Sequence, residues 1–282
     1  MRKENILVIG GTGKTGKRIV NLLNAQGHNV RVGSRSATPA FDWHKPEGWD
    51  KALEGMDKVY VTYQPDLAVP GALDAVEKLV KVAKRANLKK MVLLSGKGER
   101  EAQLSEQVVI HSGLDYTIVR ASWFNQNFSE NFLLEPVLDG FVALPQSEVQ
   151  IPWVDADDIA EVAVEVLLND EHNGNIYQLT GPETLTFPET VATIAKATDR
   201  QITYVPVSLE EYSEGMRKAR LPEDFVWLVN YLFDVVLGNP ANSEITNDIE
   251  TILGRPAKRF NQYVAETAPT GIWHVAAHQP NA

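Results

Sequence analysis

The amino-terminal stretch reads Asn5-Ile6-Leu7-Val8-Ile9-Gly10-Gly11-Thr12-Gly13-Lys14-Thr15-Gly16. An apolar strand runs directly into a glycine-rich turn, and an amphipathic helix follows the turn. In dinucleotide-binding folds this turn approaches a pyrophosphate, and the helix amino terminus offers N–H groups to the negative charge. We expect Gly10 and Gly11 to permit the sharp turn, Gly13 to approach the pyrophosphate and Gly16 to let the helix pack closely. The stretch therefore predicts a Rossmann-type cofactor site.

The same residues do not form the phosphate loop of nucleoside triphosphatases. Gly13-Lys14-Thr15 matches the end of that motif, but its first glycine would fall on Val8, inside the strand. We therefore expect the turn, including Thr12, Lys14 and Thr15, to bind a dinucleotide.

The end of the second strand indicates which dinucleotide is bound. NAD-specific sites carry an acidic residue there for the ribose hydroxyls, whereas this chain has Val32-Gly33-Ser34-Arg35-Ser36. The guanidinium of Arg35 can pair with a 2′-phosphate and stack on adenine, and Ser34 can add a hydrogen bond. This pattern favours NADP(H) as the cofactor.

The first half of the chain alternates short apolar runs with amphipathic helical patterns, as repeated βαβ units do. Helices between parallel strands would cover both faces of one sheet. The expected strands are 5–9, 29–32, 58–62, 90–94 and 116–119.

After residue 120 the alternation loosens. We expect a helix over about 157–168, strands at 175–179 and 202–207, and helices opened by capping boxes at Thr186 and Ser208. The fold class is α/β, a Rossmann-like doubly wound parallel sheet with a smaller, mostly helical carboxy-terminal lobe. The NADP(H)-binding core is placed in residues 1–150 and the substrate-side lobe in residues 151–282, interleaved with the core as one structural unit.

Composition narrows the function classes. The 282 residues carry a formal net charge of -10, which gives no electrostatic footprint for nucleic acid. The chain has no cysteine, so disulfides, thiolate catalysis and cysteine metal sites are excluded. No apolar run approaches the ~20 residues of a membrane helix, and no targeting segment is visible. We expect a soluble, cytoplasmic protein with no direct nucleic acid and no membrane partner.

Several motifs together resemble the NmrA-like atypical short-chain dehydrogenases. Beside residues 10–16, they are Ser34-Arg35-Ser36, Leu93-Leu94-Ser95-Gly96, Tyr116-Thr117-Ile118-Val119-Arg120-Ala121-Ser122-Trp123-Phe124, and Ile252-Leu253-Gly254-Arg255-Pro256. Within that family the chain is most similar to bacterial relatives of festuclavine dehydrogenase, an ergot-alkaloid reductase, and more distantly to triphenylmethane dye reductase. The resemblance runs nearly from end to end.

The resemblance implies further site residues. Thr62 and Tyr63 should border the cofactor, Ser95 and Gly96 should lie near the nicotinamide, and Asp42-Trp43 should flank the adenine. The cleft for nicotinamide and substrate should be lined by Trp123, Phe124, Asn127 and Trp153. Members of the family include reductases and redox-sensing regulators.

The proton-donating pair of ordinary short-chain dehydrogenases is missing. Those enzymes combine a serine with a Tyr-x-x-x-Lys pair one helix later; Ser95 matches the serine, but residues 99–111 contain neither tyrosine nor lysine. Tyr116 and Arg120 copy the spacing on an expected strand, where it does not reproduce helical geometry. An electrophilic substrate such as an iminium, quinone or dye cation would need hydride and little proton assistance, with Tyr63 or Ser95 as the candidate catalytic residues.

Two classes of function remain open. The first is an NADPH-dependent reductase of a small electrophilic organic molecule, and the second is an NADP(H)-sensing regulator that acts through a protein partner. Aromatic side chains favour the first class, because flat ligands need aromatic walls. The sequence leaves the substrate and a homo-oligomeric state open.

No metal site is expected. His274 and His278 match a ligand spacing but lie in the tail, and of the three acids Asp155, Asp157 and Asp158 we expect Asp157 to cap a helix.

Overall fold

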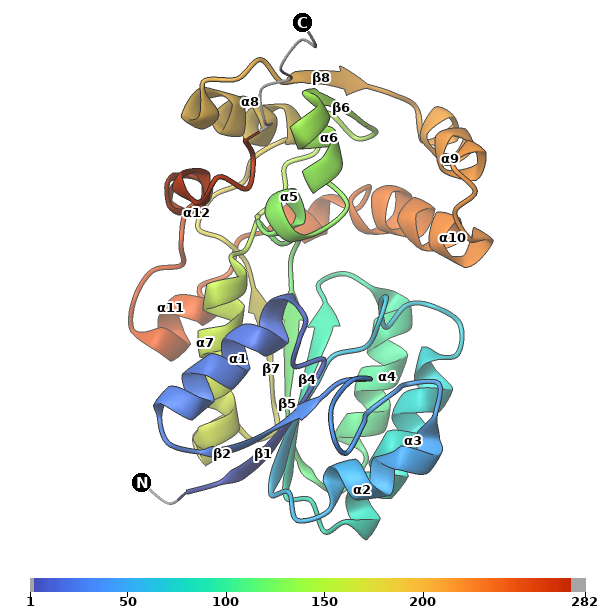
Figure 1. Ribbon diagram of the computed structural model, residues 1–282, viewed down its shortest axis with the longest axis vertical. Coiled ribbons are helices and arrows are strands. Elements are labelled where there is room, and N and C mark those ends of the chain that lie inside the picture. Colours follow the sequence, from blue (N-terminus) through green and yellow to red (C-terminus); the bar gives the residue numbers. More distant parts are fainter. Residues whose placement is uncertain (1–2, 275–282) are drawn as a thin grey trace, which may run out of the picture. The chain divides into compact units, whose positions relative to one another are not determined.

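The central sheet consists of six parallel strands in the order β2-β1-β3-β4-β5-β7. We describe residues 3–274 of a computed structural model (Figure 1). The carboxyl ends of parallel strands meet at one edge, which is where such sheets bind ligands. The strands are β1 (Asn5–Ile9), β2 (Asn29–Gly33), β3 (Lys58–Val61), β4 (Lys90–Gly96), β5 (Asp115–Ala121) and β7 (Asn175–Leu179).

Helices cover both faces of this sheet (Figure 1). One face carries α1 (Lys14–Ala25) and α7 (Ala156–Leu168), and α11 (Asp248–Leu253) packs against α7. The other face carries α2 (Trp49–Leu53), α3 (Ala72–Arg85) and α4 (Arg100–Ile110). The predicted Rossmann-like, doubly wound parallel sheet is confirmed.

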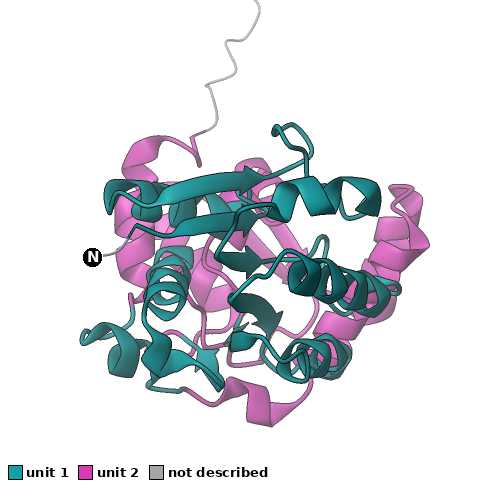
Figure 2. Ribbon diagram, turned by 90° about the horizontal axis from the view of Figure 1, so that it is seen from below, with its two compact units in different colours: residues 1–122, 156–180, 246–257 teal, residues 123–155, 181–245, 258–282 magenta. Residues whose placement is uncertain are grey.

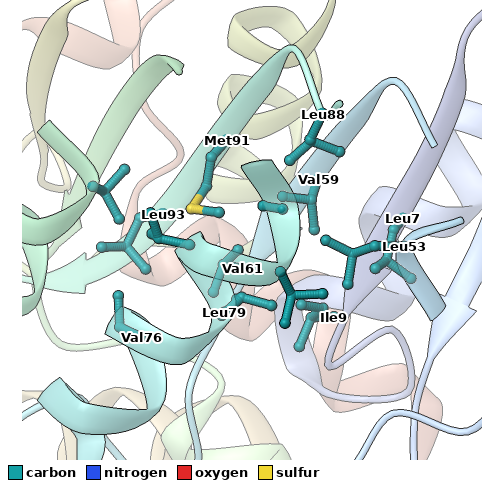
Figure 3. Packing of buried hydrophobic residues seen from close by; sticks show 14 of the residues in the cluster. Leu7, Ile9, Leu53, Val59, Val61, Val76, Leu79, Leu88, Met91 and Leu93 are labelled. Carbon is teal, nitrogen blue, oxygen red and sulfur yellow. The ribbon is translucent and has the colours of Figure 1, made fainter. Parts of the chain in front are cut away.

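The period of two along each strand sends alternate side chains to opposite faces. Figure 3 shows the buried cluster on the α2 and α3 side, where β1, β3 and β4 each contribute two apolar residues. Burial of each such side chain stabilises the fold by about 1.5–3 kcal/mol. The labelled members are Leu7, Ile9, Leu53, Val59, Val61, Val76, Leu79, Leu88, Met91 and Leu93.

The chain divides into two compact units, shown in different colours in Figure 2. Unit 1 comprises Met1–Ser122, Ala156–Thr180 and Thr246–Ala257, and it contains the six-stranded sheet. Unit 2 comprises Trp123–Asp155, Gly181–Ile245 and Lys258–Ala282. The expected division at residue 150 differs from these limits, because residues 156–180 and 246–257 supply a strand and two helices to unit 1.

Unit 2 is mostly helical, as predicted for the smaller lobe. In its described residues β6 (Phe141–Leu144) pairs with β8 (Thr203–Pro206), and the two strands run parallel, with Phe141 opposite Thr203. A five-residue π-helix, Leu232–Val236, extends the helix α10. The helices are α5 (Asn127–Glu130), α6 (Leu134–Asp139), α8 (Phe187–Thr198), α9 (Leu209–Lys218), α10 (Glu223–Tyr231) and α12 (Phe260–Thr267).

The two predicted capping boxes are confirmed. The hydroxyls of Thr186 and Ser208 accept hydrogen bonds from the backbone N–H groups of Glu189 and Glu211. In return, the carboxylates of Glu189 and Glu211 accept hydrogen bonds from the backbone N–H groups of Thr186 and Ser208. The prediction for Asp157 is wrong: α7 already begins at Ala156, so Asp157 lies inside the first turn. There it forms an ion pair with Arg18 of α1, at 2.5 Å.

Candidate functional site

The glycine-rich turn between β1 and α1 is fastened to its neighbours by backbone contacts. The N–H groups of Gly10 and Gly11 both donate to the carbonyl of Gly33 at the end of β2, at 2.9 and 3.3 Å. Gly10 has a φ of 72°, which favours glycine. A Cβ on Gly10 would lie 2.3 Å from Cγ2 of Thr62, so the ends of β1, β2 and β3 meet here.

Gly16 and Gly13 have different structural roles. A Cβ on Gly16 would lie 2.1 Å from the carbonyl oxygen of Gly10, so Gly16 lets α1 pack on the turn. A Cβ on Gly13 would approach only that same oxygen among the described residues, at 3.2 Å. Gly13 is the N-cap of α1 and has no side-chain cap. Gly13 therefore leaves room for a ligand at a helix amino terminus, which fits a pyrophosphate.

The other predicted residues of the turn lie around this point. Thr12 is exposed, and Lys14 and Thr15 begin α1. Thr15 is buried, and its hydroxyl accepts a hydrogen bond from the hydroxyl of Tyr60 on β3, at 2.8 Å. This bond fixes the first turn of α1 against the sheet.

The end of β2 presents donors and no acid. Arg35 is exposed, and no carboxylate pairs with it in the described part of the chain. The hydroxyls of Ser34 and Ser36 lie 3.3 Å apart. A guanidinium and hydroxyls at this edge suit a phosphate monoester.

Asp42 and Trp43 lie beside the end of β3, where Thr62 and Tyr63 follow the strand. The indole N–H of Trp43 donates to the carbonyl of Thr62 at 3.2 Å, and the rings of Trp43 and Tyr63 are 4.7 Å apart. Trp49 donates to the carbonyl of Asp42 at 2.8 Å. The structure therefore brings together these four predicted cofactor residues.

Tyr63 is half-buried, and burial raises the pKa of its hydroxyl. Within residues 3–274 no group forms a hydrogen bond with that hydroxyl. Tyr63 is therefore protonated at neutral pH, and its O–H is available as a hydrogen-bond donor.

Ser95 lies near the end of β4, but its hydroxyl is already engaged. It donates to Oε1 of Glu106 on α4 at 2.6 Å, and Ser95 is 5% exposed. Glu106 is buried and also accepts hydrogen bonds from Nε and an Nη of Arg120, the neighbour of Ser95 on β5. In this structure the hydroxyl of Ser95 therefore points to Glu106, and its role toward a substrate stays a prediction.

Gly96 ends β4 next to another acidic side chain. A Cβ on Gly96 would lie 1.8 Å from Oε1 of Glu99, so only glycine allows the Glu99 carboxyl to fold over the strand end. The carboxyl group of Glu99 therefore lies beside Gly96, and the sequence did not predict this neighbour.

The four predicted substrate residues all belong to unit 2. Trp123 is half-buried and contacts four rings edge-on, those of Phe132, Trp153, Phe187 and Phe233. Phe124 forms a bridge with Val154, and the N–H of Asn127 donates to the carbonyl of Phe124 at 3.0 Å.

Trp153 is a core residue of unit 2. It is 2% exposed, and its indole N–H donates to the carbonyl of Leu185 at 2.9 Å. Trp153 packs edge-on against Trp123, with ring centroids 6.0 Å apart, and its contact with a substrate stays a prediction. Phe233 reaches the same cluster from the π-helix, with its ring 5.2 Å from that of Trp123.

The sequence argument missed Glu99, Glu106 and the ion pair with Arg120. A signal was present, because Glu106 lies in the buried stripe of α4 with Ala102, Ser105 and Val109. A charged residue inside such a stripe indicates a buried partner.

Two general properties of the described residues bear on function. They contain no group of three or more His, Asp or Glu residues that could hold a metal ion, and His278 lies outside them. None of their helices has the length and apolar character needed to cross a bilayer.

The strand order and the glycine-rich turn at the start of α1 define a Rossmann-type dinucleotide-binding protein. Comparison with protein families gives the same result. A family model described as NAD(P)H-binding matches residues 10–170, and the chain belongs to this family of NAD(P)H-binding proteins.

Curated relatives match nearly the whole chain. Prestalk A differentiation protein A of Dictyostelium discoideum is 30% identical over 94% of this chain and 93% of its own. The NAD(P)H azoreductase of Xenophilus azovorans is 30% identical, over 92% and 96%. Festuclavine dehydrogenase of Aspergillus fumigatus is 27% identical, over 88% and 92%. The resemblance to festuclavine dehydrogenase predicted from sequence motifs is confirmed.

Proposed function

We propose that this protein is an NADPH-dependent reductase that delivers hydride to a small, electrophilic organic molecule such as an iminium, a quinone or a cationic dye. The observation that carries the proposal is the end of β4. Ser95 donates to Glu106, and α4 carries neither tyrosine nor lysine. A site without the usual tyrosine–lysine pair suits acceptors that attract hydride by themselves.

Different residues of unit 1 would bind different parts of NADPH. Gly13 and the first turn of α1 would hold the pyrophosphate, and Arg35 with Ser34 would hold the 2′-phosphate. Trp43 would lie against the adenine, on the evidence of its contact with Thr62 at the end of β3. Bound NADPH would supply the hydride.

Aromatic side chains support a flat substrate. Tyr63 packs on Trp43 in unit 1, and Trp123 is the half-buried member of the cluster in unit 2. Rings of this kind provide the apolar walls that flat ligands need. The azoreductase and festuclavine dehydrogenase relatives also support a reductase.

A panel of acceptors tests the proposal. Purified protein with NADPH should oxidise the cofactor in the presence of iminium compounds, quinones or cationic dyes, and should react poorly with simple ketones. If NADPH binds tightly and none of these acceptors is reduced, the protein is instead an NADP(H)-sensing regulator that acts through a protein partner.

A further inference from the structure

Two carboxyl groups meet beyond the ends of β3 and β4. Asp66 lies in the loop after β3, and Glu99 directly precedes α4. Each of the two carboxyl groups lies close enough to the other to shift its pKa. Because β3 and β4 are parallel neighbours, both loops leave the sheet at the edge where Rossmann-type sheets bind ligands.

Two neighbouring carboxyl groups, one of them with a buried oxygen that lacks a donor among the described residues, are stabilised by a shared proton. A carboxylate only accepts hydrogen bonds, so two carboxyl groups can share one only if one of them is protonated. The N–H of Ala68 donates to Oδ1 of Asp66 at 2.8 Å. Glu99 is 7% exposed, and no donor within the described chain reaches its buried Oε2.

The surrounding charges favour keeping that proton. Burial, and then the carboxyl of Asp66, raise the pKa of Glu99 well above its usual range. Glu101 and Glu106 of α4, which are also acidic, raise the pKa of Glu99 further. The guanidinium near them, that of Arg120, is paired with Glu106. Burial also raises the pKa of Asp66.

Backbone contacts with Gly96 hold Glu99 at the end of β4. Its N–H donates to the carbonyl of Gly96 at 3.4 Å, and its carboxyl occupies the space that a Cβ on Gly96 would fill. The neighbouring hydroxyl of Ser95 is engaged by Glu106. At the end of β4, Glu99 is therefore the group that holds a transferable proton.

We propose that the Asp66–Glu99 pair is the proton donor that allows this site to reduce neutral acceptors, such as quinones and azo compounds, in addition to cations. This inference rests on the reductase function proposed above. The acceptor takes hydride, with its two electrons, from the reduced cofactor. The proton moves from Glu99 to the acceptor oxygen or nitrogen that gains the electron pair. The pair is left as two carboxylates and recovers its proton from water.

The substitution Glu99→Gln removes the transferable proton and keeps the shape of the side chain. Glutamine is nearly isosteric and can donate its amide N–H to Asp66, but it has no proton to transfer. With a neutral quinone the rate of NADPH oxidation should fall by about 10²-fold or more, the range of a lost general acid. With a cationic triphenylmethane dye, which needs hydride alone, the rate should stay nearly unchanged.

Two comparisons make the result specific. Glu77→Gln removes an exposed carboxylate from α3 and should alter neither rate. In the wild-type protein the quinone rate should fall as the pH rises through the raised pKa of the pair, while the dye rate stays level. An equal loss with both acceptors would make Glu99 a structural residue, and an unchanged quinone rate would also overturn the proposal.

A second measurement does not depend on turnover. The infrared spectrum of the wild-type protein should contain the carbonyl stretch of a neutral carboxylic acid at neutral pH, and Glu99→Gln should remove it. If quinone and dye are both reduced but this band is absent, the proton-donor role is wrong and the reductase function stands. If no acceptor is reduced, both are wrong.

Discussion

Single side chains at the strand ends set what unit 1 can bind. After β2 the exposed guanidinium of Arg35 takes the place of the acid that NAD-specific sites use for the ribose hydroxyls. Ser34 and Ser36 place two hydroxyls beside it. A phosphate monoester has the charge and the acceptors to satisfy these donors, and a ribose hydroxyl does not need them.

Arg35→Ala should therefore change the choice of cofactor. We expect the affinity for NADPH to fall by at least ~10-fold, about 1.4 kcal/mol, and the affinity for NADH to change little. Fluorescence titration of both cofactors measures this. Arg85→Ala is the control, because Arg85 is an exposed cation that pairs with Asp50. An equal loss for both cofactors would exclude contact with a 2′-phosphate.

At this scale the sequence predicted the backbone part of the site better than the side-chain part. Gly10, Gly13 and Gly16 follow from spacing, because few backbone paths connect a strand to a helix around a phosphate. The partner of Ser95 could not be derived in that way. Glu106 reaches Ser95 from a helix and Arg120 from a strand, and only tertiary packing determines which buried charges meet.

Among the elements, α1 carries a functional residue and a structural residue of the same type. Gly13 faces outward at its N-cap with φ −82° and ψ −178°, a conformation open to any residue. Gly16 faces the turn, where the carbonyl of Gly10 leaves no space. The same added methyl group should therefore impair ligand binding at Gly13 and folding stability at Gly16.

Gly13→Ala should abolish or strongly weaken NADPH binding, while its free energy of unfolding changes by less than about 1 kcal/mol. Gly16→Ala should destabilise the folded protein by about 1–3 kcal/mol, because its methyl group is overpacked against the turn. Urea unfolding without cofactor, followed by NADPH titration, measures both. Retained NADPH binding in Gly13→Ala would mean that the pyrophosphate lies elsewhere.

Elements with a strong local pattern were predicted from sequence, and elements that depend on distant partners were not. Strands β1, β2 and β7 agree with the prediction within a residue, and Tyr116 lies on a strand as expected. The strand β6 was not predicted. Its four residues acquire a partner only in β8, and α7, a short 3-10 helix, β7 and α8 lie between the two strands in the sequence. The π-helix of Phe233 likewise has no distinctive local pattern.

The stability of the whole molecule should depend on the pair formed by Asp66 and Glu99. Burial raises the pKa of Glu99 in the folded state, so the folded state binds this proton more tightly than the unfolded chain. The stabilisation is complete below the unfolded pKa, about 4.3 for glutamate, and is lost as the pH rises through the folded pKa.

The wild-type protein should therefore be most stable relative to Glu99→Gln near pH 4, and this advantage should shrink as the pH rises. Urea unfolding of both proteins over a series of pH values measures the difference. A difference that stays constant with pH would mean that Glu99 binds its proton no more tightly in the folded state.

The path of the chain through the two units also limits how recombination can exchange them between related genes. The chain passes from one unit to the other after residues 122, 155, 180, 245 and 257. Neither unit corresponds to an uninterrupted part of the gene, so recombination at a single point cannot replace one unit and spare the other. The two units should therefore be inherited together, which agrees with two relatives that align over 92% or more of this chain. New substrate preferences in this lineage should therefore arise by point mutation within an inherited whole.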